Sequence, residues 1–226
     1  MRSTRLLANN VYNIKTVVGG IQTDRENMTN TSNKANTHNG HEFVDLGLPS
    51  GTLWATRNVG ARTPKDKGLY FAWGETEGYS ADQVENGVRN FYSSEYEAGP
   101  VASISADLTL EQDAAHAYMG GNWRMPTKAE CQELLDNCDA VWTTYGRTRV
   151  FGKLFTSKIN GNSVFLPAAG GCDDSSVFLT GSDGYYWAAS WDSSSLAYLL
   201  SFCSGDPLVR IDYRYYGYSV RGVCKR

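Results

Sequence analysis

The order of apolar and polar positions divides the chain into a polar first segment and a longer segment of short strand patterns. Residues 23–41 are almost entirely polar and rich in Asn and Thr, which is typical of a linker. From Glu42 onward, short apolar or alternating runs are separated by turns that contain Gly, Pro or Asp. We therefore expect an N-terminal arm and polar linker over residues 1–41 and a folded domain over residues 42–226.

Most of the apolar runs in the second segment are short enough to be strands, and several are rich in aromatic or β-branched residues. The Asn160-Gly161 pair separates two of them and is typical of a tight hairpin turn. Residues 76–106 have no such pattern and are expected to form a loop. Strands are expected at residues 42–47, 52–60, 68–73, 149–157, 163–170, 184–191, 196–203 and 218–224.

Two segments have helical patterns instead. One spans residues 109–119, with Thr109 as its N-cap and Gly120-Gly121 at its end. The other begins at Thr127, where Glu130 three residues later completes a capping box. Two helices among many strands predict an α+β domain made of short, mostly antiparallel strands.

Composition narrows the class of protein. The chain has 226 residues, 41% of them hydrophobic, and a net charge of −3. It has no apolar run of 18 residues, so we expect no membrane-spanning helix. The mild acidity argues against nucleic acid as a partner. The first 20 residues contain two Arg but no continuous apolar run, which makes a poor signal peptide.

The residues that usually carry catalysis or bind metals are scattered. Five cysteines, an odd number with no CxxC pair, match neither a disulfide framework nor a zinc site and are expected to be free thiols. The Asp173-Asp174 pair is expected to be a solvated turn. Neither a Ser/His/Asp set nor a phosphate-binding glycine loop is present. We therefore predict no catalytic residue, no metal site and no cofactor.

The C-terminal block has an unusual composition. Seven of the chain's 14 Tyr lie in residues 185–226. Residues 192–223 contain no Lys, Glu, Gln, Met or Trp, although these types make up 32 of the 226 residues. The last of the 15 Asn is Asn162. Tyr offers a large, rigid contact area with a polar tip, so a tyrosine-rich block of this kind is typical of a binding surface.

Three stretches resemble one superfamily. Residues 123–127 (WRMPT), with Glu130 three later, are similar to the WRLPTxxEW signature of C-type-lectin-fold proteins related to formylglycine-generating enzymes. Residues 43–60 and 70–75 are similar to a domain found in gut bacteroidete proteins and their phages. The block from Gly184 to Val223 resembles the variable region of proteins that diversity-generating retroelements mutate. The resemblance implies a C-type lectin fold with a variable region at about residues 186–223.

Such retroelements randomise template adenines, often in Asn codons, which cannot become Lys, Glu, Gln, Met or Trp codons. The resemblance implies that the diversified, ligand-binding positions are Ser195, Leu196, Leu199, Ser201, Cys203, Asp206, Leu208, Arg210, Ile211, Asp212, Tyr213, Tyr215, Tyr216 and Tyr218. It also implies that the unchanging frame positions are Ala197, Tyr198, Leu200, Phe202, Ser204, Val209, Arg214, Gly217, Ser219, Val220 and Arg221.

The strand pattern at residues 196–203 agrees with this division. Leu200 and Phe202 alternate with Leu199, Ser201 and Cys203, so the two sets point to opposite faces of a strand. We expect the core to hold the first set and solvent to reach the second. Five large polar-tipped side chains at residues 213–216 and 218 cannot all point inward, so we expect this cluster to be exposed.

The resemblance leaves other activities to weigh. Formylglycine-generating relatives use a pair of cysteines, but the surroundings of Cys203 and Cys224 do not match that motif. Calcium-binding lectins of this fold carry EPN or QPD together with WND, and the chain has none of these tripeptides. Trp123 and Arg124 are expected to be structural, as a core indole and an arginine that bridges strands. We expect a non-enzymatic protein that binds a protein or glycan receptor outside the cell, as a phage tail component or surface adhesin. An undiversified glycan-binding module is the alternative. The oligomeric state stays open.

Overall fold

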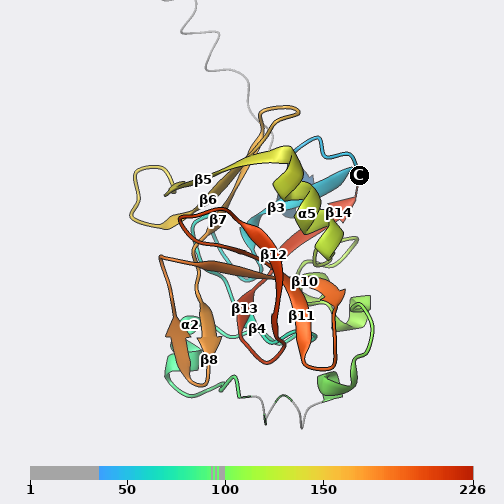
Figure 1. Ribbon diagram of the computed structural model, residues 1–226, viewed down its shortest axis with the longest axis vertical. Helices are drawn as coiled ribbons and strands as arrows, with labels where there is room; N and C mark the ends of the chain where they lie inside the picture. The colour runs from blue at the N-terminus through green and yellow to red at the C-terminus, as the bar shows by residue number, and fades with distance from the viewer. Residues whose placement is uncertain (1–35, 93, 95, 97–99, 226) are drawn as a thin grey trace, which may run out of the picture. The chain divides into compact units, whose positions relative to one another are not determined.

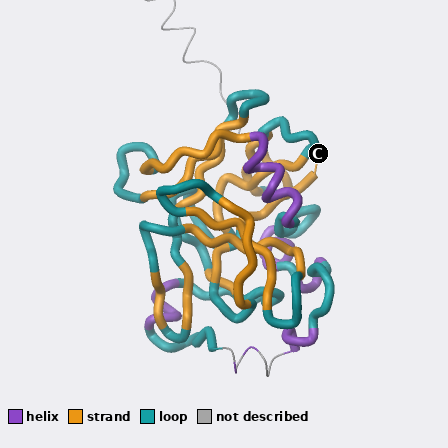
Figure 2. The backbone as a smooth tube through the Cα atoms, viewed as in Figure 1, coloured by secondary structure: helices purple, strands orange, loops and turns teal. Residues whose placement is uncertain are grey.

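Strands form most of the regular structure of the chain in a computed structural model (Figure 2). The structure describes residues 36–92, 94, 96 and 100–225. The predicted N-terminal arm and most of the predicted linker therefore lie outside the described residues. The end of that linker is described: β1 (Thr37–His38) pairs with β2 (His41–Asp45) through a tight turn. The strand structure thus begins a few residues before Glu42.

A five-stranded sheet carries the C-terminal block, with the strands in the order β12-β11-β10-β13-β4. Its pairs are antiparallel except for β10 and β13, which run parallel. β12 is an edge strand, whereas β11 and β10 are internal. The bounds are β4 (Tyr70–Phe71), β10 (Gly184–Trp191), β11 (Leu196–Phe202), β12 (Leu208–Tyr213) and β13 (Tyr218–Ser219).

Three smaller sheets surround this one (Figure 1). The first has the order β1-β2-β3-β14, with β3 (Thr52–Asn58) and β14 (Arg221–Lys225). The second is the meander β5 (Cys138–Thr144), β6 (Phe151–Ser157) and β7 (Ser163–Pro167), whose β6–β7 turn contains the predicted Asn160-Gly161 pair. The third pairs β8 (Gly171–Asp173) with β9 (Ser176–Phe178).

Apolar side chains cover both faces of the five-stranded sheet. On one face Trp187 and Leu199 pack with Trp73 and Trp123. On the other face Tyr186, Leu200 and Phe202 pack with Trp54 and with Leu134 of α5 (Lys128–Asn137). Figure 1 shows α5 lying beside β11 and β12, and the two strands contact it. The core therefore lies on both sides of β10 and β11.

The predicted helix at Thr127 is confirmed as α5. The side chain of Thr127 accepts a hydrogen bond from the Glu130 amide, and the Glu130 carboxylate accepts one from the Thr127 amide, which completes the capping box. The predicted helix 109–119 is only partly right. The extended backbone of Asp113 divides it into the 3₁₀ turn η3 (Leu110–Gln112) and α4 (Ala114–Met119), and Asp113 caps α4.

The predicted loop 76–106 contains regular structure that the sequence analysis missed. Ser80 caps α2 (Ala81–Glu85), and η2 (Pro100–Ser103) follows, so the expected count of two helices is too low within the described residues. None of these helices is both long and apolar enough to cross a membrane. The mixture of helices with mostly antiparallel strands confirms the α+β class.

Candidate ligand-binding surface

The predicted variable residues follow the chain from the end of the β10–β11 turn to β13. They divide into internal strand positions, edge-strand positions and turns. Ser195 precedes β11, which carries Leu196, Leu199 and Ser201; Cys203 and Asp206 lie in the β11–β12 turn; β12 carries Leu208, Arg210, Ile211, Asp212 and Tyr213; Tyr215 and Tyr216 follow it; and Tyr218 is in β13.

The expectation that one face of β11 is open to solvent is wrong. Leu199 is fully buried, and Ser201 is 5% exposed. The two residues do point away from Leu200 and Phe202, as the alternation predicts, but a second apolar cluster covers their face. Residues on both faces of β11 are therefore held by the core, and a ligand cannot reach Leu199 in this structure.

Tyr218 is also buried, although we expected the large side chains at residues 213–216 and 218 to be exposed. It is 2% exposed, and its ring centroid lies 4.8 Å from that of Trp187. Its hydroxyl donates to Asp212 Oδ2 at 2.9 Å. Phe71 pairs with Tyr218 across β13 and β4, so the strand pairing itself directs this side chain inward. Tyr218 therefore packs in the core next to this surface and is not part of the exposed area.

The remaining three tyrosines of residues 213–218 lie close together at this surface. We call Tyr213, Tyr215 and Tyr216 the tyrosine cluster. Tyr213 is 50% exposed, and the other two are half-buried. The ring centroids of Tyr213 and Tyr215 lie 5.5 Å apart, and those of Tyr215 and Tyr216 lie 4.6 Å apart. Phe178 packs edge-on against Tyr216. The rings support one another, which reduces the conformational entropy that binding would cost.

An ion pair borders the tyrosine cluster on β12. Arg210 Nη2 lies 2.8 Å from Asp212 Oδ2, and Arg210 Nε donates to the Ser201 hydroxyl. The Arg210 guanidinium also lies 5.3 Å from the ring centroid of Tyr185. Because Asp212 accepts from Tyr218 as well, the pair connects the exposed strand to the buried aromatic layer.

The hydroxyls of Tyr185 and Tyr216 stay protonated near neutral pH. Burial raises the pKa of Tyr185 to about 12, and the Asp183 carboxylate adds to that rise. A hydrogen bond with Tyr215, followed by burial, raises the pKa of Tyr216. These groups therefore act as neutral donors and acceptors, which suits recognition more than acid–base chemistry.

A pocket of about 560 Å³ adjoins the tyrosine cluster. Arg214 lies at its wall and is fully buried, which agrees with its assignment as a frame position. Its burial contradicts the expectation that the whole cluster at residues 213–216 and 218 is exposed. Its guanidinium donates to the carbonyls of Val101, Ile104 and Ser194 and packs 4.4 Å from the Trp73 ring centroid. Arg214 thus fixes the backbone where the cluster begins. The lining residues are Tyr96, Ala102, Ser194, Ser195, Tyr213, Arg214 and Tyr215.

The β11–β12 turn is another exposed part of the predicted variable set. Cys203 and Asp206 are exposed, and Leu208 is 48% exposed. Lys153 of β6 is almost fully buried, and its Nζ donates to the Gly205 carbonyl at 2.6 Å. The turn and Tyr213 lie at opposite ends of β12, and Ile211, which is 39% exposed, lies between them.

Most frame positions are buried, but not all of them. Ser204 is exposed in the β11–β12 turn, whereas Tyr198 and Val209 are half-buried. Arg221 is fully buried and donates to Asn58 Oδ1 and to the carbonyls of Ala55 and Phe165. Burial lowers its pKa to about 10, so the guanidinium keeps its charge and joins three segments.

Several residues of this surface were missed by the sequence analysis. Tyr96 and Ala102 lie in the region predicted to be a loop, and Phe178 lies on β9, which was not predicted. Tyr185 of β10 is half-buried and packs against Phe178 and Tyr218. No local pattern marks these residues, because long-range pairing brings them to the C-terminal block.

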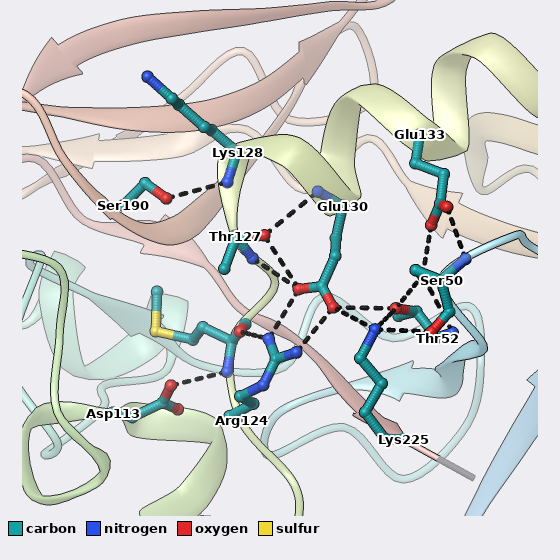
Figure 3. A network of polar contacts seen from close by, with 11 residues as sticks. Ser50, Thr52, Asp113, Arg124, Thr127, Lys128, Glu130, Glu133, Ser190 and Lys225 are labelled. Carbon is teal, nitrogen blue, oxygen red and sulfur yellow. Dashed lines mark hydrogen bonds and ion pairs between the residues drawn. The ribbon is translucent and has the colours of Figure 1, made fainter.

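Arg124 and Thr127 of the WRMPT motif form polar contacts with Glu130 in the scaffold (Figure 3). The Arg124 guanidinium donates to both Glu130 oxygens at 2.7 Å, and Thr52 and Lys225 also bind this carboxylate. Burial alone would raise the pKa of Glu130, but these bonds outweigh it and hold that pKa well below its usual range. The structure confirms that Trp123 is a core residue. Arg124 bridges segments with its backbone, which pairs with Val223, while its side chain binds Glu130.

All five cysteines are free thiols, and only Cys203 is exposed. No group of three or more His, Cys, Asp or Glu side chains in the described ranges could hold a metal ion. Burial and the neighbouring Asp174 raise the pKa of Asp173.

Comparison with known proteins adds no assignment to this geometry. No protein-family model, no curated protein and no solved structure matches the chain significantly.

Proposed function

We propose that the chain is a non-enzymatic binding protein that recognises a protein or glycan receptor through the tyrosine cluster and the adjoining pocket. The observation that carries this proposal is the exposure of Tyr213, together with Tyr215 and Tyr216, on a backbone that buried Arg214 holds in place. Aromatic side chains with polar tips provide large contact areas at low entropic cost. A rigid backbone below them lets the side chains change without loss of the fold.

We propose further that the protein has a C-type lectin fold and that retroelement mutagenesis diversifies this surface. The absence of five residue types from residues 192–223 supports diversification, because randomised Asn codons cannot produce them. The burial of Arg214, Val220 and Arg221 beside exposed Leu208, Ile211 and Tyr213 is consistent with a fixed frame and a variable surface. The protein would then act outside the cell, as a phage tail component or surface adhesin.

The binding proposal is tested with the triple variant Tyr213→Ser, Tyr215→Ser, Tyr216→Ser. Binding of the full chain is measured on arrays of defined glycans and of purified bacterial surface proteins. We expect the triple variant to lose at least about tenfold in affinity for any array member that the native chain binds, because aromatic residues dominate binding energy. Its melting temperature should stay within a few degrees of the native value.

The matched control is Tyr92→Ser, which removes a tyrosine that is 38% exposed and lies outside the cluster. Its affinity should equal that of the native chain. Equal binding by the triple variant and the native chain would overturn the proposed surface.

Diversification has a separate test in the genome that encodes the chain. A reverse transcriptase gene should lie near a second copy of the 3′ coding sequence that differs only at template adenines. If no such copy exists, the alternative function, an undiversified glycan-binding or adhesin module with the same surface, replaces the diversified receptor.

A further inference from the structure

A second concave surface lies outside the C-terminal block. This basic cleft has a volume of about 560 Å³ and is formed by residues 60–62, 65–69, 80–81, 149–150, 167–168 and 180–181. None of the predicted variable residues lines it. Four cationic side chains do: Arg62, Lys65, Lys67 and Arg149.

The lining of the basic cleft has more cationic than acidic side chains. Asp66 is the single acidic residue of the lining, in a chain whose net charge is −3. Its carboxylate already accepts a hydrogen bond from the Thr63 amide at 2.8 Å. Six other cations among the described residues form ion pairs, at Arg57, Arg89, Arg124, Lys158, Arg210 and Lys225. The four of the cleft form none with any described carboxylate, although Lys67 Nζ lies 3.4 Å from the Thr180 hydroxyl.

The loops that carry these cations are fixed by the fold. Gly68 has a φ of +76°, and a Cβ there would come within 2.3 Å of the Val59 carbonyl oxygen, so the loop requires glycine. Asn58 Nδ2 donates to the Lys67 carbonyl at 2.7 Å. On the opposite side, the Tyr145 amide donates to the Val150 carbonyl and closes the turn that carries Arg149. A ligand would therefore meet cations on an ordered backbone, which lowers the entropic cost of binding.

We propose that the basic cleft binds a small ligand with at least two sulfate or phosphate ester groups. Guanidinium groups bind such oxyanions through paired, charge-assisted hydrogen bonds, and ammonium groups add point charges. The cleft volume is in the range of small-molecule sites and suits one or two sugar rings. Because its residues lie outside the variable set, this ligand would stay the same while the tyrosine cluster changes. The inference does not depend on the function proposed for that cluster.

Isothermal titration calorimetry of the full chain tests the basic cleft with three probes. They are a trisulfated heparin disaccharide, glucose 1,6-bisphosphate and the unsulfated form of the disaccharide. We expect one-site binding of at least one ester, no detectable binding of the unsulfated sugar, and weaker binding at high salt. The preferred ester identifies the chemistry. Absence of saturable binding of both esters at millimolar concentration would overturn the proposal.

Two matched double variants separate a defined site from general attraction of anions. Arg62→Gln with Arg149→Gln removes two exposed cations of the cleft, and Arg147→Gln with Lys158→Gln removes two exposed cations outside it. The first should weaken binding of the ester at least about tenfold, and the second less than about twofold. Equal losses of affinity in the two double variants would overturn the site. A hexaglutamate peptide serves as an additional probe for general attraction of anions, and tighter binding of this peptide than of both esters would also overturn the site. Circular dichroism confirms that both variants are folded.

Discussion

β11 and β12 are neighbours in one sheet and belong to the same C-terminal block, but they differ in how much of each strand solvent reaches. Leu199 and Leu200 on β11 are both fully buried, although they point to opposite faces. On β12, Ile211 is 39% exposed and Tyr213 is 50% exposed. β11 lies between β10 and β12 with apolar clusters on both faces, whereas no strand of the described residues pairs with the outer side of β12.

This difference shows that the position of a strand in the sheet decides which side chains can change freely. Alternation along a strand separates two faces, but it does not tell whether a second layer covers the outer one. In a diversified block, substitutions at the exposed positions of β12, such as Ile211 and Tyr213, would preserve the fold. Substitutions at Leu199 or Tyr218 would alter the core.

The largest expected effect contrasts a buried tyrosine with an exposed one. Tyr218→Ala should lower the free energy of unfolding by about 3–5 kcal/mol, because it empties a buried site against Trp187 and removes a hydrogen bond to Asp212. Tyr213→Ala should lower it by about 1 kcal/mol or less, because half of that side chain is already in solvent. Urea denaturation of both variants measures the two values.

Tyr218→Phe serves as the control, because it keeps the ring and removes only the hydroxyl. Its effect should lie between those of the two alanine variants. Similar losses for Tyr218→Ala and Tyr213→Ala would contradict the burial difference between the internal strand β13 and the edge strand β12.

A smaller effect contrasts the buried ion pair of the scaffold with the pair on the edge strand. Glu130→Gln should cost about 1.5–3 kcal/mol, because it leaves Arg124 without the carboxylate that both of its terminal nitrogens bind. Asp212→Asn should cost about 1 kcal/mol or less, because Arg210 is partly exposed and water can replace the pair. The comparison is made by urea denaturation at pH 7.

Acid provides an independent measurement on the same scaffold pair. The pKa of Glu130 is held below its value of 4.5 in the unfolded chain, so the carboxylate stabilises the fold fully above that pH. Its contribution should decrease as the pH falls from 4.5 toward the folded pKa. The difference in stability between the native chain and Glu130→Gln should shrink over that range, and a constant difference would contradict the assignment.

Local signals in the sequence were enough to predict α5, the β6–β7 hairpin and the α+β class. The capping box at Thr127 and the Asn160-Gly161 turn depend on residues within four positions of one another. The sequence did not predict β12, because its residues, LVRIDY, mix apolar and charged types on a strand with one open edge. The burial of Tyr218 depends on Phe71 and Trp187, which are distant in sequence, and no local pattern contains that contact.

The smallest expected effect uses the cysteines to compare the β11–β12 turn with the core. Cys203 is exposed in that turn, whereas Cys131 and Cys172 are buried, and burial raises the pKa of both thiols. A thiol reagent such as Ellman's reagent should therefore react rapidly with one thiol in the native chain and with all five after denaturation. Cys203→Ser should abolish the rapid reaction and change the free energy of unfolding by about 0.5 kcal/mol or less, as expected at an exposed position. Rapid reaction of a second thiol would show that the core opens more easily than its packing indicates. The difference in solvent access between the core and the β11–β12 turn would then be smaller than the structure shows.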